Sequence, residues 1–487
     1  MTIGSLDLAI LVAYLLATVA FGLWIGRGQK TSQDYLLGGR DLPWWALLLS
    51  IVATETSTAT FLSVPGIAYG GFPGTTGDLR FLQLPLGYLL GRVVAARLLL
   101  PLYFQGQLYT AYDVLRHRSG PAVRTLASGL FLVTRTLSDG LRLYLAAVVL
   151  GLMLGWELSW CVAAVGAATV VYTVFGGIRA VVWTDVIQFA VYMLGAGAAL
   201  WVLAGQLPDG LLGTLERAHD AGRLRVFDLG FDPGSPYTLW AGLIGGAVLS
   251  IGSHGTDQLI VQRYLSARTL GDAQKALLWS GPVVLLQFAF FLVLGTALFF
   301  FHQAHPPAEP YPDSDHVFAD FVVRNLPPGM VGVVLGAVFA AAMSTLSSSL
   351  SASASALVND FVLPLRGRTQ DHPSALPLAR AATVLFALLQ VGVGISGLGG
   401  GAVVGKVLAI AGVTTGVILG LFLLALRSKP DPRASLVGLL AGLLAIAFVV
   451  FGLPWLEWPL GWPWHGLITC AATFLGGTAA RMVPAAP

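Results

Sequence analysis

Long apolar stretches recur along almost the whole of this sequence. A window of about 19 residues predicts thirteen membrane spans, near residues 5–26, 44–71, 79–103, 124–154, 157–177, 180–204, 237–256, 272–301, 329–361, 375–397, 402–426, 433–454 and 463–482. Mean hydropathy is +0.78, and only 10% of the residues are charged. Because hydrocarbon offers backbone polar groups no partner, such spans must be helices. The sequence therefore predicts an all-α polytopic membrane protein, with residues 1–487 forming a single transmembrane domain.

Basic residues are distributed unevenly between the predicted loops. Placing the N-terminus outside puts most of the 27 Lys and Arg residues on the cytoplasmic face and the acidic loops 209–232 and 309–320 on the outer face. The positive-inside rule therefore predicts a multi-pass protein of the plasma (cytoplasmic) membrane, with the N-terminus outside and the C-terminus inside. The small net charge of +3 says little about partners, and no nucleic-acid partner is expected. Cys161 and Cys470 both lie in apolar segments, so they predict no disulfide.

The ninth span contains an unusual run of hydroxyl groups, AAAMSTLSSSLSASAS at residues 340–355. On a helix, five serines at three- and four-residue spacing form one polar stripe: Ser344, Ser347, Ser348, Ser351 and Ser355. The side chains of Ser344 and Thr345 point about 100° apart around the helix axis. Their hydroxyls can therefore bind one small cation together only if carbonyls from a second, broken helix complete the site. Sodium is a hard cation that prefers oxygen ligands. The alternative is that these small residues allow close helix packing and bond to their own helix.

Two other spans look interrupted at similar depth. The second, SIVATETSTATFLSVPG, has Thr54, Glu55, Thr56, Ser57 and Pro65 in its middle and outer parts, and the seventh, GGAVLSIGSHGTDQ, is rich in glycine. The two interrupted spans are five spans apart. Because five is an odd number, a second copy of the repeat would cross the membrane in the opposite orientation to the first. We therefore expect an inverted pair of repeats, 44–204 and 237–426, each opening with a broken helix, plus extra helices at 5–26 and 433–482. The alternative is that the glycines only ease packing.

Several ionisable side chains are predicted at membrane depth, where a charge is a functional hypothesis by default. In the second and fourth spans these are Glu55, Arg135, Asp139 and Arg142. Because Arg135, Asp139 and Arg142 follow one another at one-turn spacing, a self-neutralising structural triad is the alternative. His254 is more simply explained as a hydrogen-bonded structural residue.

Asp185 lies one or two turns inside the sixth span. A carboxylate at that depth is costly unless it is paired or binds a cation. Its structural alternatives are a local bond to Thr184 and an ion pair with Arg179.

Four motifs in order resemble the sodium/solute symporter family, whose members include sodium-coupled sugar, proline, sialic-acid and vitamin carriers. They are GGRDLP at 38–43, YTVFGGIRAVVWTDVIQ at 172–188, TDQLIVQRYLSA at 256–267 and AAAMSTLSSSLSASASALVNDF at 340–361. The resemblance covers at least spans two to nine. It implies an inverted five-plus-five core and transport of a small polar organic solute with sodium.

The resemblance also implies ion ligands. The common sodium site would use the carbonyls of Ala53, Thr56 and Ala341 together with the hydroxyls of Ser344 and Thr345. Some family members bind a second sodium, whose ligands would correspond here to Ser344 again and to Asp185, Ser347 and Ser348. Whether one or two ions are transported is left open.

The solute is expected near the midplane, between the broken spans and the third and fourth spans. The expected contacts are Glu55, Ser57, Thr60, Gln83 and Arg135. The resemblance implies that Arg135 binds a solute carboxylate, and Glu55 corresponds to an acidic residue of the proline carriers. Glu55 could also pair with Arg135 itself. Sugar carriers have a stacking tyrosine where this chain has Ser253 and His254, so a sugar is disfavoured.

We therefore expect a sodium-coupled symporter that imports an amino acid such as proline, or a carboxylate, by alternating access. Sodium is the co-transported ion, and the expected partners are the solute and the lipid bilayer, with the monomer as the functional unit. The rivals are a proton-coupled carrier, with Glu55 or Asp185 titrating, and a sodium-coupled sugar carrier. A membrane sensor on a transporter fold is more remote. An enzyme is not expected, because no nucleophile elbow, phosphate loop or metal-ligand cluster is present.

Overall fold

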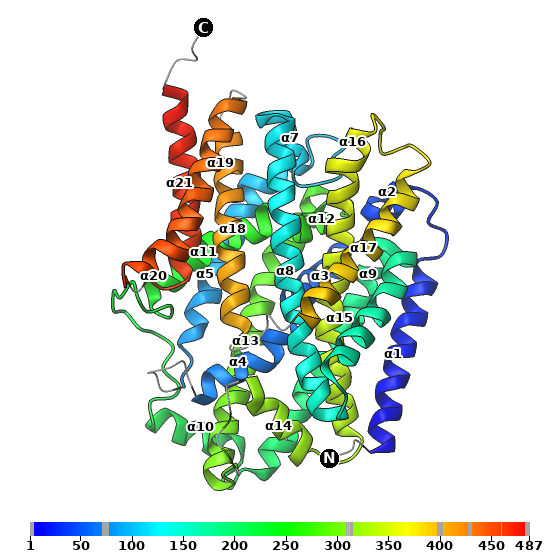
Figure 1. Ribbon diagram of the computed structural model, residues 1–487. Helices are drawn as coiled ribbons and strands as arrows, with labels where there is room; N and C mark the ends of the chain where they lie inside the picture. Colours follow the sequence, from blue (N-terminus) through cyan, green and yellow to red (C-terminus); the bar gives the residue numbers. More distant parts are fainter. Residues whose placement is uncertain are drawn as a thin grey trace.

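The computed structural model describes residues 4–70, 77–307, 309, 311, 315–396, 403–426, 431–458 and 460–482. Roughly parallel and antiparallel helices form one bundle, with the two termini at opposite ends (Figure 1). This placement agrees with an odd number of crossings. Seven helices of the described part are long and apolar enough to cross a membrane, or eight if one bent pair counts as a single span.

Each of the thirteen predicted spans is helical in the structure. In chain order they correspond to α1 (Ser5–Ile25), α3 (Trp44–Glu55) with α4 (Thr58–Gly70), α5 (Gln83–Val94) with α6 (Leu100–Tyr103), α8 (Pro121–Leu154), two arms of α9 (Leu158–Gln206), α11 (Gly246–Gly255), α13 (Leu270–Ala304), α15 (Met330–Ala356), α17 (Ala375–Ile395), α18 (Val403–Ala425), α19 (Pro432–Ala447) and α21 (Pro463–Met482). Residues 71, 397 and 402, at the edges of three predicted spans, lie outside the described residues.

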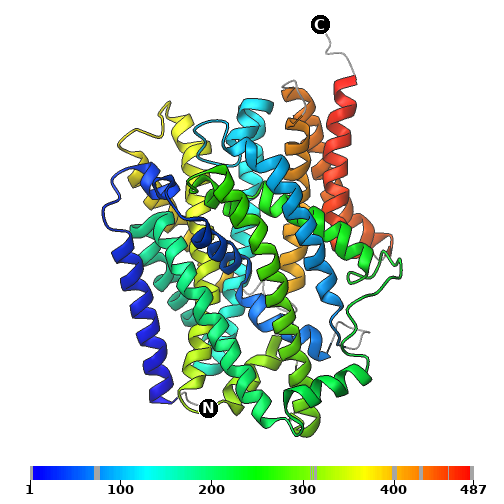
Figure 2. The same ribbon diagram turned by 180° about the vertical axis from the view of Figure 1, so that it is seen from behind.

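Shorter helices lie between the spans. They are α2 (Ser32–Leu37), α7 (Asp113–Ser119), α10 (Gly210–Asp220), α12 (Gln258–Leu265), α14 (Asp315–Asn325), α16 (Leu363–Leu365) and α20 (Leu453–Trp455). Helix α1, dark blue, stands at the edge of the bundle in both views (Figures 1 and 2). The side chain of Asp7 on α1 accepts hydrogen bonds from the N–H groups of Gly329 (2.8 Å) and Gly332 (2.7 Å). A carboxylate there caps the N-terminus of α15 and ties the extra helix to it.

Helix α9 contains two predicted spans in 49 residues. At 1.5 Å per residue a straight helix of this length would measure about 74 Å, far more than one bilayer. The helix is interrupted at Gly177, whose φ of 54° and ψ of −162° are not helical. A Cβ atom at Gly177 would also lie 2.4 Å from the carbonyl oxygen of Tyr35 on α2. Only glycine fits this bend, which agrees with the predicted boundary between residues 177 and 180.

Gly177→Ala is expected to lower the free energy of unfolding by about 2 kcal/mol or more, because the new methyl group meets both the positive φ and the Tyr35 carbonyl. Gly197→Ala, farther along α9, is the matched control, because a Cβ atom there has no neighbour within 4 Å. The control should be neutral or slightly stabilising. Melting temperatures of the detergent-purified variants measure the difference. Equal behaviour of the two variants would contradict this role of Gly177.

Both predicted helix breaks are present. Between α3 and α4 the chain is extended at Thr56 (φ −82°, ψ 92°), and the two helices are bent by 57°. Between α11 and α12 it is extended at Asp257 (φ −81°, ψ 124°), whose carboxylate caps α12 by accepting the N–H of Leu259. The breaks leave carbonyl and N–H groups without helical partners in the middle of the bundle.

Helix α15 occupies the centre of the bundle, where it packs against α9, α8, α17 and α1. Every residue from Val334 to Ala356 is buried, including all the hydroxyl residues of the stripe. A helix buried on all sides has no lipid-facing surface. Its hydroxyls therefore point at other helices, and the broken helix α3 is one of them.

Candidate functional site

The predicted sodium ligands meet where α15 crosses the end of α3. The hydroxyl oxygen of Ser344 lies 3.0 Å from the carbonyl oxygen of Ala53 and 3.1 Å from that of Ala341. The hydroxyl oxygen of Thr345 lies 3.3 Å from the carbonyl oxygens of Ala341 and Thr54. Four of the five predicted ligand residues therefore lie together, and the Thr54 carbonyl lies beside them as an additional oxygen.

The spacing of these oxygens suits one hard cation. Oxygens that share a cation at about 2.4 Å in an octahedron stand about 3.4 Å apart. The hydroxyls now bond to the carbonyls, and a cation among them would replace those bonds. The fifth predicted residue, Thr56, lies in the break and donates its hydroxyl to Gln287 Oε1 at 2.9 Å. No group of three or more His, Cys, Asp or Glu in the described ranges could hold a metal.

Asp185 belongs to a second buried cluster, and its partner is Arg263 on α12. Nη2 of Arg263 lies 3.0 Å from Asp185 Oδ2, and neither side chain is exposed to solvent. The hydroxyl of Ser50 lies 2.5 Å from the same carboxylate oxygen. Of the two partners considered from the sequence, Thr184 instead donates to the Ala180 carbonyl of its own helix.

Arg263 also contacts another residue predicted for a second sodium. Its Nη2 donates to the hydroxyls of Ser348 and Thr54, and these two hydroxyls lie 2.9 Å apart. Ser347, the remaining residue of that predicted set, donates to the Ser344 carbonyl of its own helix at 3.2 Å. The sequence offered one signal for Arg263, a basic residue inside the motif at 256–267.

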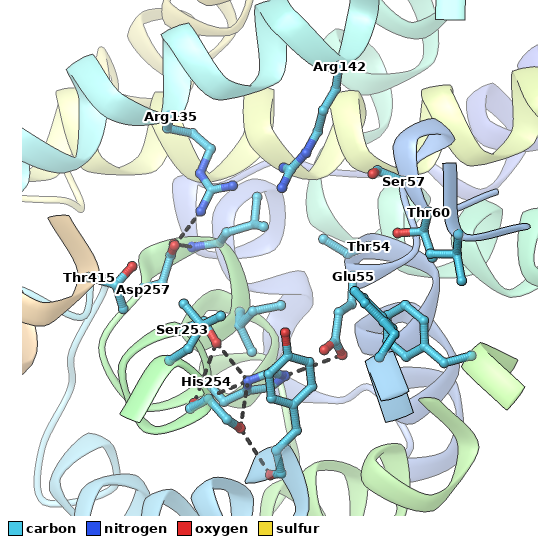
Figure 3. A pocket seen from close by; sticks show the side chains of 18 residues that line it. Thr54, Glu55, Ser57, Thr60, Arg135, Arg142, Ser253, His254, Asp257 and Thr415 are labelled. Atoms are coloured by element: carbon cyan, nitrogen blue, oxygen red, sulfur yellow. Dashed lines mark hydrogen bonds and ion pairs between the residues drawn. The ribbon is translucent and has the colours of Figure 1, made fainter. Parts of the chain in front are cut away.

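Between the two helix breaks and α8 lies a cavity of about 150 Å³. Its polar lining comes from α3, α4, α5, α8, α11 and the α11–α12 break, with Thr415 on α18 (Figure 3). The lining side chains that carry charge or hydrogen-bonding groups include Thr54, Glu55, Ser57, Thr60, Tyr88, Arg135, Arg142, Ser250, Ser253, His254, Asp257 and Thr415. Four of the five predicted solute contacts line this cavity, namely Glu55, Ser57, Thr60 and Arg135.

Two arginines of α8 extend into the cavity from one side (Figure 3). Arg135 pairs through Nη2 with Asp257 at the second break, and its Nη1 lies 3.6 Å from Asp139 Oδ1. Arg142 donates to the same Asp139 oxygen at 2.6 Å. The structural triad foreseen from the spacing is therefore formed, and Asp257, which the sequence prediction missed, adds a second carboxylate.

Glu55 approaches the cavity from α3 but does not pair with Arg135. Its partner is Arg92 of α5, whose side chain is only 1% exposed, and His254 Nε2 lies 3.5 Å from the same carboxylate oxygen. The other ring nitrogen of His254 lies 3.0 Å from the Ser253 hydroxyl. The sequence prediction missed Arg92, although its depth in the third span satisfies the criterion that selected Arg135.

Gln83 does not line the cavity and instead bonds to the segment between α10 and α11. Its amide nitrogen donates to the carbonyls of Tyr237 (2.9 Å) and Arg80 (3.1 Å), and its Oε1 accepts the N–H of Asp228 at 3.0 Å. Burial alone would raise the pKa of the Asp228 carboxyl, but bonds from the Gly230 N–H and Arg80 hold this pKa below its usual value.

Comparison with known proteins gives the family and the fold. The sodium:solute symporter family model matches residues 35–445. The human sodium/iodide cotransporter is 30% identical, over 91% of this chain and 68% of its own length, and human sodium-coupled monocarboxylate transporter 1 is 28% identical, over 90% and 71%.

Among solved structures, an outward-open Na⁺-coupled sialic acid symporter is 25% identical and superposes with a TM-score of 0.87 over 99% of both chains. The nucleobase-cation symporter Mhp1, at 14% identity, has a TM-score of 0.60 over 93% of this chain and 94% of its own, and so shares the fold. The fold is therefore that of the five-plus-five repeat transporters, and the protein is a multi-pass membrane symporter rather than an enzyme. With its motifs, its paired helix breaks and these matches, this chain belongs to the sodium:solute symporter family.

Proposed function

We propose that this symporter imports a small organic solute carrying a carboxylate, such as an amino acid or a monocarboxylate, with sodium bound at Ser344 and Thr345. The observation that supports the ion site most is that the Ser344 hydroxyl meets the Ala53 carbonyl, and the Thr345 hydroxyl the Thr54 carbonyl, at the end of α3. A sodium ion there would bridge α3 and α15. The Thr56 carbonyl remains a proposed fifth ligand.

The charges in the cavity support an anionic or zwitterionic solute. Nε of Arg135 and Nε of Arg142 have no hydrogen-bond partner among the described residues. A guanidinium grips a carboxylate with two parallel bonds, so a solute carboxylate would bind between these side chains. The ammonium group of an amino acid would then lie toward Glu55 or Asp257.

Coupling follows from differential affinity between two conformations. Sodium would favour the state in which the end of α3 is close to the middle of α15, and that state would bind solute more tightly. A membrane potential contributes about 2.3 kcal/mol per charge for each 100 mV, which drives a cation inward. We propose the orientation predicted from the loop charges, with the N-terminus outside, and a monomer as the functional unit.

The test is uptake by proteoliposomes under an inward sodium gradient or an equal potassium gradient. The panel contains proline, lactate and pyruvate as labelled carboxylates and a labelled hexose as the control. We expect sodium-dependent uptake of at least one labelled carboxylate. The other carboxylates should compete with this uptake to an extent that depends on their size. The hexose should not be taken up. Uptake that needs no sodium and follows a proton gradient would favour the proton-coupled rival instead.

A further inference from the structure

A second, much smaller cavity of about 10 Å³ lies between α8 and α15. Ala341 and Thr345, two residues of the proposed sodium site, line it from α15, and Asp139 and Arg142 line it from α8. Arg142 also lines the larger cavity proposed for the solute (Figure 3). Asp139 and Arg142 therefore lie between the proposed ion site and the proposed solute site.

The two carboxylate oxygens of Asp139 have different surroundings. Oδ1 accepts the hydrogen bond from Arg142 at 2.6 Å and lies 3.6 Å from Nη1 of Arg135. Oδ2 is buried and has no hydrogen-bond partner among the described residues. The whole side chain is shielded from solvent. A buried carboxylate oxygen without a partner is costly, and a cation nearby would stabilise it.

The proposed sodium ligands carry no negative charge of their own. They are backbone carbonyls and two hydroxyls, so a sodium ion among them brings an unbalanced positive charge into the bundle. Such a charge is unfavourable at membrane depth unless a carboxylate lies nearby. Asp139 is a carboxylate on the same small cavity as Thr345. The buried Asp185 is another, but its partner Arg263 does not line the solute cavity.

We propose that Asp139 couples the ion site to the solute site. Sodium at the proposed ion site attracts the charge of Asp139, weakens the bond from Arg142, and so leaves this guanidinium available to the solute carboxylate. Asp139 is then a positioning residue, because it acts on the solute through Arg142. This inference rests on the proposed function, since it takes the sodium site and a carboxylate solute as its two ends.

The charge balance around the triad supports this coupling. Two positive and two negative side chains make the network neutral, namely Arg135, Arg142, Asp139 and Asp257. Sodium adds one positive charge, and a solute carboxylate adds one negative charge. Because an unbalanced charge in a low-dielectric interior is unfavourable, each ligand favours the binding of the other. By linkage, sodium raises the affinity for the solute by the same factor as the solute raises the affinity for sodium.

Equilibrium binding of radioactive sodium to the detergent-purified protein, without any solute, tests the coupling. Asp139→Asn should raise the sodium Kd about tenfold or more, because the small cavity then holds no carboxylate. Arg142→Gln should lower this Kd about threefold or more, because Asp139 then has one positive partner fewer. Shifts of the two variants in the same direction, or no shift in either, would show that the triad is structural and overturn the proposal.

The matched control is Asp257→Asn. It removes a carboxylate from the same network, but Asp257 does not line the small cavity. Its sodium Kd should stay within about threefold of the wild-type value, and a rise as large as that of Asp139→Asn would contradict a specific role for Asp139. Equal sodium Kd values for the wild type and Asp139→Asn would overturn the coupling and leave the sodium site intact. A wild type without saturable sodium binding would overturn the proposed sodium site itself.

Labelling of the native protein with phenylglyoxal is a second measurement that depends on no variant. The reagent modifies arginine side chains, and mass spectrometry of peptides gives the extent of reaction at each arginine. Sodium, compared with potassium at equal ionic strength, should raise the labelling of Arg142 relative to Arg135 about twofold or more. Arg135 is the internal reference, because it lines the same cavity and keeps its pair with Asp257. An equal change at both arginines, or no change at either, would contradict the release of Arg142.

Discussion

Asp185→Asn is expected to lower the free energy of unfolding by about 3–5 kcal/mol, the usual cost of leaving one partner of a buried ion pair uncompensated. Arg263 would keep its charge while losing the only carboxylate among its described contacts. Its remaining partners are neutral hydroxyls and one carbonyl, which stabilise a buried guanidinium less well. Thermal or urea unfolding of the detergent-purified variant measures the loss.

The surface pair of Asp41 and Arg268 provides the matched control. Their charged atoms lie 2.8 Å apart, but the side chains are 69% and 53% exposed. Asp41→Asn should change stability by about 0–1 kcal/mol, because solvent screens such a pair. If Asp185→Asn lowers the free energy of unfolding no more than Asp41→Asn does, the buried pair of Asp185 and Arg263 does not stabilise the fold.

Arg135→Gln is expected to reduce sodium-driven uptake by about a hundredfold or more, measured as uptake rate over KM for whichever carboxylate the panel identifies. Losing one partner of a desolvated charge pair usually costs about 2–5 kcal/mol of binding. Here the substitution also leaves Asp257, which pairs with Arg135, as an unneutralised negative charge facing the solute. Arg135→Lys should recover only part of the rate, because an ammonium cannot make two parallel bonds.

The control for Arg135 is Arg217→Gln. Arg217 forms an ion pair with Asp209 at 3.2 Å, with exposed fractions of 44% and 54% for the two side chains. Uptake by this variant should match the wild type. If Arg135→Gln also transports at the wild-type rate with unchanged KM, then this arginine does not bind the solute, and Arg142 becomes the remaining candidate.

Local patterns predicted most of the fold. Apolar stretches of sufficient length gave all thirteen helical segments, because a membrane span depends on its own composition. Glycine and polar residues inside two of those stretches correctly indicated the breaks at Thr56 and Asp257. The hydroxyl stripe needed a broken partner helix, and Ser344 contacts Ala53 on that helix.

The pairing of charges could not be predicted in the same way. Asp185 and Arg263 are 78 residues apart, and Arg135 and Asp257 are 122 apart. Such pairs form only when separate helices pack, and several arginines and acids at similar depth offered equally good partners. Glu55 is an example. Arg92 and Arg135 are both predicted at membrane depth, and only the packing of the helices decides that Glu55 pairs with Arg92. Gln83 was expected to add a neutral contact to the solute, but its amide bonds to the segment between α10 and α11.

The central claim is that Ser344 and Thr345 hold sodium, and the most direct test is thermal stability in sodium against potassium at equal ionic strength. A ligand that binds only the folded state stabilises it, by about 2.7 kcal/mol at a hundred times its Kd. The matched control is Ser353→Ala, because this buried hydroxyl on the same helix has no partner among the described residues. We expect sodium to raise the melting temperature of the wild type and of Ser353→Ala, but not of Ser344→Ala with Thr345→Ala. Equal stabilisation of all three proteins, or of none, would contradict the sodium site.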